Sequence, residues 1–273
     1  MREDGTFVLD LNRMQPALPD EMNTFLAAGK PAQEEARRAV QAAGVKNLLP
    51  EEEVRLLAPL PHPGKIICLG HNYRDHMGKD RTEPPDFPTF FCKTGNTVIG
   101  PGESIVIPPE TEQADFEAEL AVVIGRRTRR VAEREALECV AGYTIFNDVS
   151  ARDYQKRTSQ WMIGKSFDTF GPMGPALVTA DEIPDPHSLD LALTVNGNPR
   201  QQTNTRRMIF SIPFLIAYLS AVITLDPGDV IATGTPARTQ AAPGAPEFLQ
   251  PGDVVRITIE RIGQLENPVM AEQ

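Results

Sequence analysis

Cysteine, long apolar runs and blocks of basic residues are all scarce in this sequence. The three cysteines lie far apart and form no CxxC pair, which argues against a zinc cage or a dithiol redox centre. No stretch of about 18 apolar residues could span a bilayer, and the N-terminus MREDGTFVLD is charged where a signal peptide would be apolar. The net charge is -10, and no basic stripe could replace phosphate counterions. We therefore expect a cytoplasmic protein with no membrane or nucleic-acid partner.

Several common catalytic motifs are also absent, since GxSxG, GxGxxG and HExxH do not occur. The tripeptide GKS at 164–166 invites a phosphate-loop interpretation. That motif needs a glycine five residues before Gly164, where this chain has Ser159. The sequence therefore does not predict a phosphate-binding loop.

The chain divides by composition into a small N-terminal domain, residues 1–60, and a larger domain, residues 61–273. The first contains the Ala- and Glu-rich stretch EEARRAVQAAG with helical spacing, and a Pro-rich linker ends it near Gly64. Helical spacing also appears at 133–140, 150–157 and 208–222. In the last of these we expect Pro213 to lie in the first turn or to kink the helix.

The larger domain is dominated by short β-type runs separated by turns, three of which begin Pro-Gly-acid. The predicted strands are KIICLG (65–70), TFFCK (89–93), SIVIP (104–108), FEAELAVVIG (116–125), GYTIFNDV (142–149), LALTVNGN (191–198), DVIATG (229–234) and DVVRITIE (253–260). Helices are too irregularly placed for a βαβ repeat, so we predict a β-rich α+β domain with a curled or doubled sheet.

Three carboxylates form the first candidate site. Alternation along a strand places Glu117 and Glu119 on one face, where the apolar flanks predict burial. An isolated ExE is otherwise a solvated strand face. Asp148 ends a strand-like run before a helical one, where it is either an N-cap or a metal ligand. Together the three suit Mg²⁺ or Mn²⁺.

Basic and hydroxyl side chains supply further candidates. Lys165, beside Trp161 in QWMIGKSF, is either a surface lysine or a group that stabilises an oxyanion. His71 and His76 could each act as a general base, but a spacing of five does not fit a two-histidine metal site on a helix. Thr235 follows a predicted strand. It is either part of an ordinary strand-ending turn or a hydroxyl donor to a substrate carboxylate.

Read in order, these segments resemble the fumarylacetoacetate hydrolase family over about residues 60–270. The motifs that carry the resemblance are LGHNYRDH, IGPGESIVIP, DFEAELAVVIG, GYTIFNDVSARD, QWMIGKSFDTFGPMGP, LDPGDVIATGTP and PGDVVRITIERIG. The resemblance implies a mixed β-sandwich roll, a small N-terminal domain and a homodimer. It also implies the roles of eight residues: metal ligands Glu117, Glu119 and Asp148, catalytic Lys165, the general base His76, and substrate contacts from Gln155, Thr235 and the lid residue Tyr73.

Two positions depart from the family pattern. Many hydrolytic members have a Glu three residues after the lid histidine, and this chain has Lys79. The family's TGTP is commonly followed by Gly-Val-Gly, which is Arg-Thr-Gln at 238–240 here, within a 236–251 loop. The first departure puts water activation in doubt and the second alters the rim of the site.

The resemblance implies a metal-dependent hydrolase that cleaves a C–C bond in a 2,4-dioxo acid, such as an acylpyruvate, to a pyruvate-type product and a carboxylic acid. The alternative uses the same metal without the water. It is a decarboxylase or tautomerase of oxo-dicarboxylic acids such as oxaloacetate or 2-hydroxyhepta-2,4-dienedioate, and Lys79 favours it. A third hypothesis is a non-catalytic metal- and acid-binding module.

Overall fold

The computed structural model describes residues 7–76, 83–239 and 247–273, and the chain divides into two compact units, Met1–Leu56 and Leu57–Gln273. Within the described residues, no helix combines the length and apolar character that a membrane span requires. Each unit has its own hydrophobic cluster.

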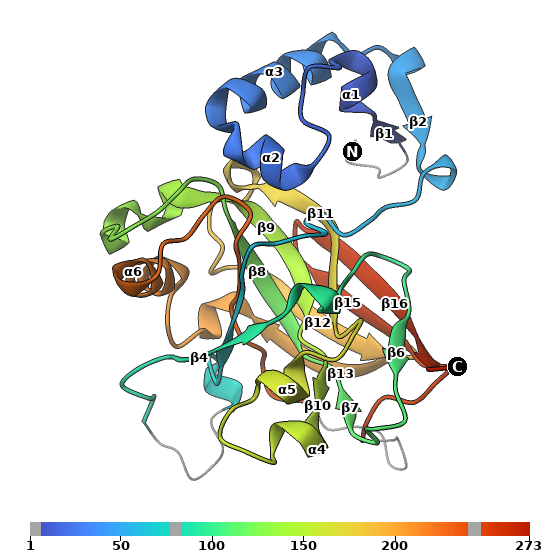
Figure 1. Cartoon of the computed structure of the whole chain (residues 1–273), viewed down its shortest axis with the longest axis vertical. Coiled ribbons are helices and arrows are strands. Elements are labelled where there is room, and N and C mark those ends of the chain that lie inside the picture. Colours follow the sequence, from blue (N-terminus) through green and yellow to red (C-terminus); the bar gives the residue numbers. More distant parts are fainter. Residues whose placement is uncertain (1–6, 77–82, 240–246) are drawn as a thin grey trace. The chain divides into compact units, whose positions relative to one another are not determined.

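The first unit combines one strand pair with short helices (Figure 1). Strands β1 and β2 pair antiparallel. Alanines spaced four apart on the longest helix, Ala32 and Ala36, pack with Leu18 in a small core. The elements are β1 (Phe7–Leu9), α1 (Leu11–Met14), α2 (Met22–Ala27), α3 (Gly29–Ala42), η1 (Val45–Asn47), β2 (Leu48–Pro50) and η2 (Glu51–Glu53).

The second unit is built on two sheets (Figure 1). Seven strands lie in the order β4-β3-β14-β8-β9-β11-β5 and five in the order β13-β12-β15-β16-β6, while β7 and β10 form a separate pair. The strands are β3 (Ile66–Gly70), β4 (Thr89–Lys93), β5 (Val98–Ile99), β6 (Ile105–Ile107), β7 (Ala114–Asp115), β8 (Ala118–Ile124), β9 (Val140–Asn147), β10 (Ser150–Ala151), β11 (Gly171–Thr179), β12 (Asp190–Val195), β13 (Asn198–Asn204), β14 (Val230–Ala232), β15 (Val254–Ile259) and β16 (Gly263–Ala271).

The burial of each strand follows its sequence pattern. Strand β8 is buried at every residue, as expected for a continuous apolar run in the middle of a sheet. Strands β12 and β15 instead alternate between buried and exposed residues, with one face toward the core. The predicted β-rich α+β fold with a doubled sheet is confirmed.

Helices are few and short in the second unit. They are α4 (Arg152–Gln155), α5 (Met162–Lys165) and α6 (Ile212–Val222), with 3-10 turns η3 (Arg74–His76), η4 (Gly95–Thr97), η5 (Glu133–Cys139), η6 (Ala180–Glu182) and η7 (Thr205–Arg207). The helix predicted at 133–140 is thus a 3-10 helix, and the one predicted at 150–157 is reduced to α4 behind β10. Pro213 lies in the first turn of α6, where its missing N–H leaves no hydrogen bond unmade, and Ser211 caps that turn.

Candidate metal centre and active site

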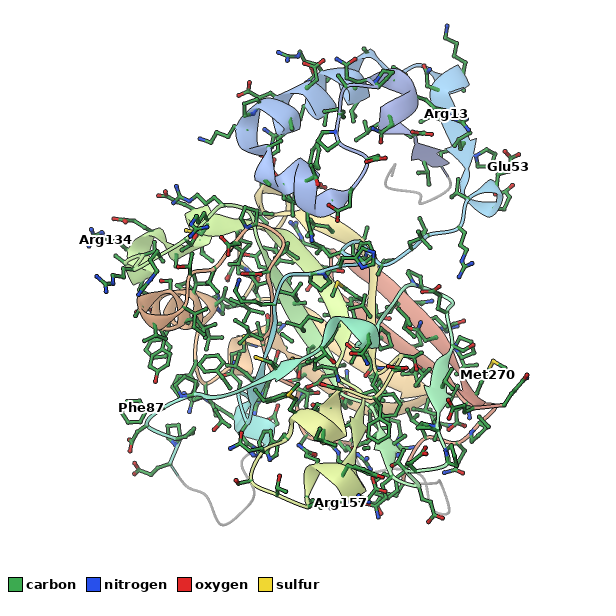
Figure 2. The ribbon with its side chains drawn as sticks, in the orientation of Figure 1. Arg13, Glu53, Phe87, Arg134, Arg157 and Met270 are labelled. Carbon is green, nitrogen blue, oxygen red and sulfur yellow. The ribbon has the colours of Figure 1, made fainter. Side chains whose placement is uncertain are left out.

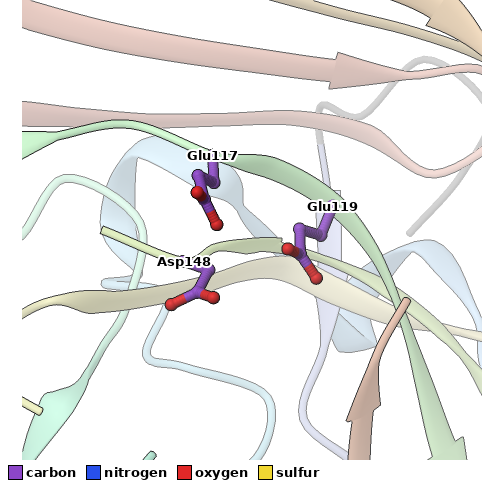
Figure 3. A group of neighbouring side chains, drawn as sticks. All are labelled: Glu117, Glu119 and Asp148. Carbon is purple, nitrogen blue, oxygen red and sulfur yellow. The ribbon is translucent and has the colours of Figure 1, made fainter. Parts of the chain in front are cut away.

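Three buried carboxylates meet where β8 begins and β9 ends. Glu117 precedes β8, Glu119 is its second residue, and Asp148 follows β9. The antiparallel pairing of these strands brings the backbone N–H of Asp148 to the carbonyl of Glu117 at 2.9 Å. One oxygen from each carboxylate lies within 4.8 Å of the others, and Figure 3 shows the three side chains converging. The structure therefore brings together all three predicted metal ligands.

Two buried lysines neutralise part of this acidic cluster. The Lys165 Nζ donates to Glu117 Oε2 at 2.7 Å and to Asp148 Oδ2 at 2.8 Å. The Lys93 Nζ donates to the other Asp148 oxygen, Oδ1, at 2.7 Å and to the Val149 carbonyl at 2.9 Å. Each oxygen of Asp148 thus accepts a hydrogen bond from one lysine ammonium group. Lys93 was not among the residues predicted from the sequence, where its only distinguishing feature is that it ends the strand-like run TFFCK.

The surroundings shift the pKa values of the two glutamates in opposite directions. Burial alone would raise the pKa of Glu117, but Arg152 and Lys165 outweigh it and hold that pKa well below its usual range. Burial, Asp148 and Glu117 raise the pKa of Glu119 well above its usual range. Glu119 is therefore the carboxylate of the cluster that lacks sufficient positive charge nearby.

The hydrogen bonds of Glu119 show the same deficit. Its Oε2 accepts the Gly234 N–H at 2.8 Å. Its Oε1 is buried and has no hydrogen-bond partner among the described residues, which ordinarily costs about 1–3 kcal/mol. A hard divalent cation would satisfy that oxygen and relieve the repulsion among the carboxylates. The residues present thus fit Mg²⁺ or Mn²⁺.

Lysine 165 carries a positive charge at this site. Burial alone would lower the pKa of Lys165, but Asp148 and Glu117 outweigh that effect and raise it. The pKa of Lys93 is lowered, first by burial and further by Lys165, against the opposing pull of Asp148. Of the two lysines, Lys165 lines the cavity described next and Lys93 does not.

A cavity of about 480 Å³ opens beside the cluster. Of the residues predicted from the sequence, Glu117, Gln155, Lys165 and Thr235 line it. The Thr235 hydroxyl donates to the Ala118 carbonyl at 3.0 Å and accepts from Gln201 Nε2 at 2.8 Å, which fixes it at the wall. Gln155 accepts from Arg152 at 2.8 Å.

Tyr73 is placed differently from the prediction, and the side chain of His76 lies outside the described part of the structure. Tyr73 is fully buried and is not among the residues that line the cavity. Its hydroxyl has no partner among the described residues, and burial, with Glu119 nearby, raises its pKa far above the usual range. His76 ends η3, but its side chain lies outside what the structure describes, as does Lys79. His71 does line the cavity, with its ring edge-on to Trp161 at 5.6 Å between centroids.

Further charged residues line the cavity, among them Asp115, Arg152 and Arg238. Arg238 belongs to the departure at 238–240 noted in the sequence, whereas Asp115 and Arg152 were not selected from the sequence. Arg152 reaches Asp115 Oδ2 at 2.7 Å and Glu117 Oε1 at 2.5 Å. Figure 2 shows how densely side chains fill the region between the two sheets and the segments α4 and α5. These three residues become adjacent only through folding, so their spacing in the sequence carries no signal.

Comparisons with known proteins place this chain in a family. The family model described as fumarylacetoacetate (FAA) hydrolase C-terminal matches residues 65–270. A mitochondrial oxaloacetate tautomerase of Xenopus laevis is 44% identical, covering 98% of this chain and 84% of that protein. A 5-carboxymethyl-2-hydroxymuconate delta-isomerase from Mycobacterium smegmatis is 42% identical with a TM-score of 0.74, covering 83% and 86% of the two chains.

A third similar protein is a maleylpyruvate hydrolase from Sphingobium sp. SYK-6, solved with manganese(II) and pyruvate. It is 33% identical, with a TM-score of 0.82, and the match covers 98% of this chain and 94% of that one. The similar proteins thus include isomerases and a hydrolase.

Proposed function

Because this chain belongs to the fumarylacetoacetate hydrolase family, we propose that it is a divalent-metal-dependent tautomerase of oxaloacetate or a closely similar 2-oxo dicarboxylic acid. The observation that carries the proposal is the ammonium of Lys165, held by Glu117 and Asp148 at the cavity beside a carboxylate cluster that fits a metal ion. Resemblance to a tautomerase and to an isomerase favours the alternative raised by the sequence over C–C hydrolysis.

The reaction moves one proton and one double bond. In the keto direction the enol oxygen at C2 loses its proton, C3 gains one, and the C2–C3 double bond becomes a C2 carbonyl. A cation held by Glu117, Glu119 and Asp148 would supply positive charge that stabilises the enolate. We propose that the Lys165 ammonium donates a hydrogen bond to the oxygen at C2 and stabilises negative charge there. His76 is predicted from the sequence as a general base, and we propose that in this reaction it carries the proton at C3.

The remaining groups position the substrate. We propose that Gln155 and Thr235 contact it, since both line the cavity. Either Mg²⁺ or Mn²⁺ would suit the three carboxylates. That the protein forms a homodimer remains a prediction from the family resemblance.

A second candidate is hydrolysis of an acylpyruvate to a pyruvate-type product and a carboxylic acid. It is supported by the similarity to a maleylpyruvate hydrolase solved with manganese(II) and pyruvate, which extends over 98% of this chain. The two reactions share the metal site and differ in whether water attacks the substrate.

The test uses freshly dissolved enol oxaloacetate and follows the loss of enol absorbance, with Mg²⁺ and then with excess EDTA. We expect a metal-dependent rate well above the spontaneous one, and its loss in Lys165→Met. Pyruvate release from a panel of acylpyruvates is assayed in parallel. Acceleration of pyruvate release alone would reject tautomerisation in favour of hydrolysis.

A further inference from the structure

Two arginines share one buried carboxylate at the wall of the cavity. Arg152 Nε lies 2.7 Å from Asp115 Oδ2, and Arg238 NH2 pairs with the other oxygen, Oδ1. Asp115 is only 2% exposed. One carboxylate cannot neutralise two guanidinium groups, and Arg152 also turns toward Glu117. The unmatched positive charge therefore falls largely on Arg238.

Arg238 is held rigidly but stays open to the cavity. Its guanidinium lies over the rings of Phe116 and Phe248, 5.0 and 5.7 Å from their centroids. NH1 donates to the Glu247 carbonyl at 2.8 Å, and 29% of the side chain is exposed. Among the described residues, Asp115 and the Glu247 carbonyl engage two of its five N–H groups, which leaves donors for an anion. Its position is one where the family resemblance leads us to expect glycine.

The charge on the cavity wall points to a doubly charged ligand. Four cations, Lys93, Arg152, Lys165 and Arg238, match four acids, Asp115, Glu117, Glu119 and Asp148. Arg200 adds a further buried guanidinium over the Phe116 ring, and Lys156 and Glu247, which also line the cavity, have opposite charges. A divalent ion at the carboxylate cluster would therefore leave at least two positive charges in excess. A dicarboxylate dianion offsets two of them, whereas a monocarboxylate offsets one.

The spacing fits a short dicarboxylate. Asp115, which holds the arginine, lies two residues before Glu117, which belongs to the carboxylate cluster. Two residues of extended chain span at most about 7 Å. One guanidinium group joins the two, since Arg152 contacts Asp115 through Nε and Glu117 through NH2. The Arg238 end and the carboxylate cluster thus flank a single side-chain group, and a short diacid suffices to reach from one to the other.

We propose that Arg238 determines specificity by binding the distal carboxylate of the substrate, the one remote from the 2-oxo group. This inference rests on the proposed function and narrows it to dicarboxylic acids. Arg152 and the two aromatic rings position the guanidinium, and Asp115 anchors it.

The test compares substrates and ligands that differ only in this carboxylate. Tautomerisation of oxaloacetate is compared with tautomerisation of its 4-methyl ester. Both rates are measured for the wild type, Arg238→Gln and Arg238→Lys. The control is Arg127→Gln, because the Arg127 side chain is 75% exposed. We expect Arg238→Gln to lower the ratio of kcat/KM for diacid over ester about tenfold, equivalent to about 1.4 kcal/mol, chiefly through KM. Arg238→Lys should recover part of the ratio, and the control should not alter it.

A binding measurement separates this inference from the proposed reaction. Calorimetry with Mg²⁺-loaded protein compares malate with lactate, which share a 2-hydroxy acid group and differ in the distal carboxylate. We expect malate to bind the wild type about tenfold more tightly, and Arg238→Gln to remove that preference. Absence of turnover with a retained preference for malate would reject the tautomerase and leave the subsite standing. Equal affinity of the wild type for malate and lactate would refute the proposed subsite. An equal decrease of kcat/KM for oxaloacetate and its ester in Arg238→Gln would refute it as well.

Discussion

The substitution Glu119→Gln should raise stability without metal and abolish stabilisation by metal. In the metal-free protein, Glu119 is a buried carboxylate with one orphaned oxygen, and burial together with Asp148 and Glu117 raises its pKa. A group with a raised carboxyl pKa costs stability as pH rises above the unfolded value, because the folded state must either retain a proton or hold an unpaired charge.

The magnitude follows from what the amide keeps and removes. Glutamine retains an oxygen for the Gly234 N–H and replaces the orphaned oxygen by a donor facing neighbouring carboxylates. Removing an unsatisfied buried acceptor is worth about 1–3 kcal/mol. In a domain of this size that corresponds to roughly 2–12 °C in Tm, at about 2–4 °C per kcal/mol. The wild type instead gains about 2.7 kcal/mol at a metal concentration one hundred times Kd.

Differential scanning calorimetry at pH 7, in EDTA and in excess Mg²⁺, measures both effects. The control is Glu138→Gln, a surface glutamate whose side chain is 69% exposed. We expect the order of the two Tm values to invert between the conditions, with the variant higher in EDTA and the wild type higher in Mg²⁺. A variant less stable than the wild type in EDTA would refute the argument that the carboxylate burdens the metal-free fold.

Three further predictions concern residues around the site and one remote helix. Lys93→Met leaves Asp148 without one of its ammonium partners and should cost about 3–5 kcal/mol in urea unfolding; a loss below about 1 kcal/mol would contradict the role assigned to that ion pair. The Nε2 of His187 accepts the first backbone N–H of α6, and burial lowers the pKa of this histidine. The free energy of unfolding should therefore fall as pH drops below about 6.5, by up to about 1.4 kcal/mol per pH unit. His187→Gln should flatten the dependence of the unfolding free energy on pH. Identical slopes for the wild type and the variant would exclude His187 as the cause. Gly70→Ala would place a Cβ 2.4 Å from the ring of Trp161, the chain's single tryptophan, so its emission should shift and KM should rise; an unchanged spectrum would show that the ring does not pack there.

The sequence predicts local features of this site well. The alternation in FEAELAVVIG places Glu117 and Glu119 on one side of the chain, and the apolar flanks predict burial of the strand. Asp148 is recognisable because it closes the neighbouring strand, and antiparallel pairing then brings it opposite Glu117. These are short-range patterns, which the strand geometry alone enforces.

Long-range partners are beyond such patterns. Lys93 meets Asp148 across 55 residues, and Arg238 meets Asp115 from a loop, so neither pairing leaves a periodic trace in the sequence. The family resemblance implies a lid position for Tyr73, but its ring lies in the hydrophobic core. Tertiary packing decides these positions, since a single buried ring outweighs the local composition.

The bridging ammonium of Lys165 has a consequence for ion selectivity. Glu117 and Asp148 already have a monovalent cation between them, tethered to the chain and therefore present at a high effective concentration. Sodium or potassium would only repeat the charge that the lysine supplies, and would have to surrender its hydration shell to do so. A divalent ion brings charge that the lysine cannot, and Glu119 offers it an oxygen without a hydrogen-bond partner in the described part of the chain. We therefore expect the site to select ions by valence before it selects them by ionic radius.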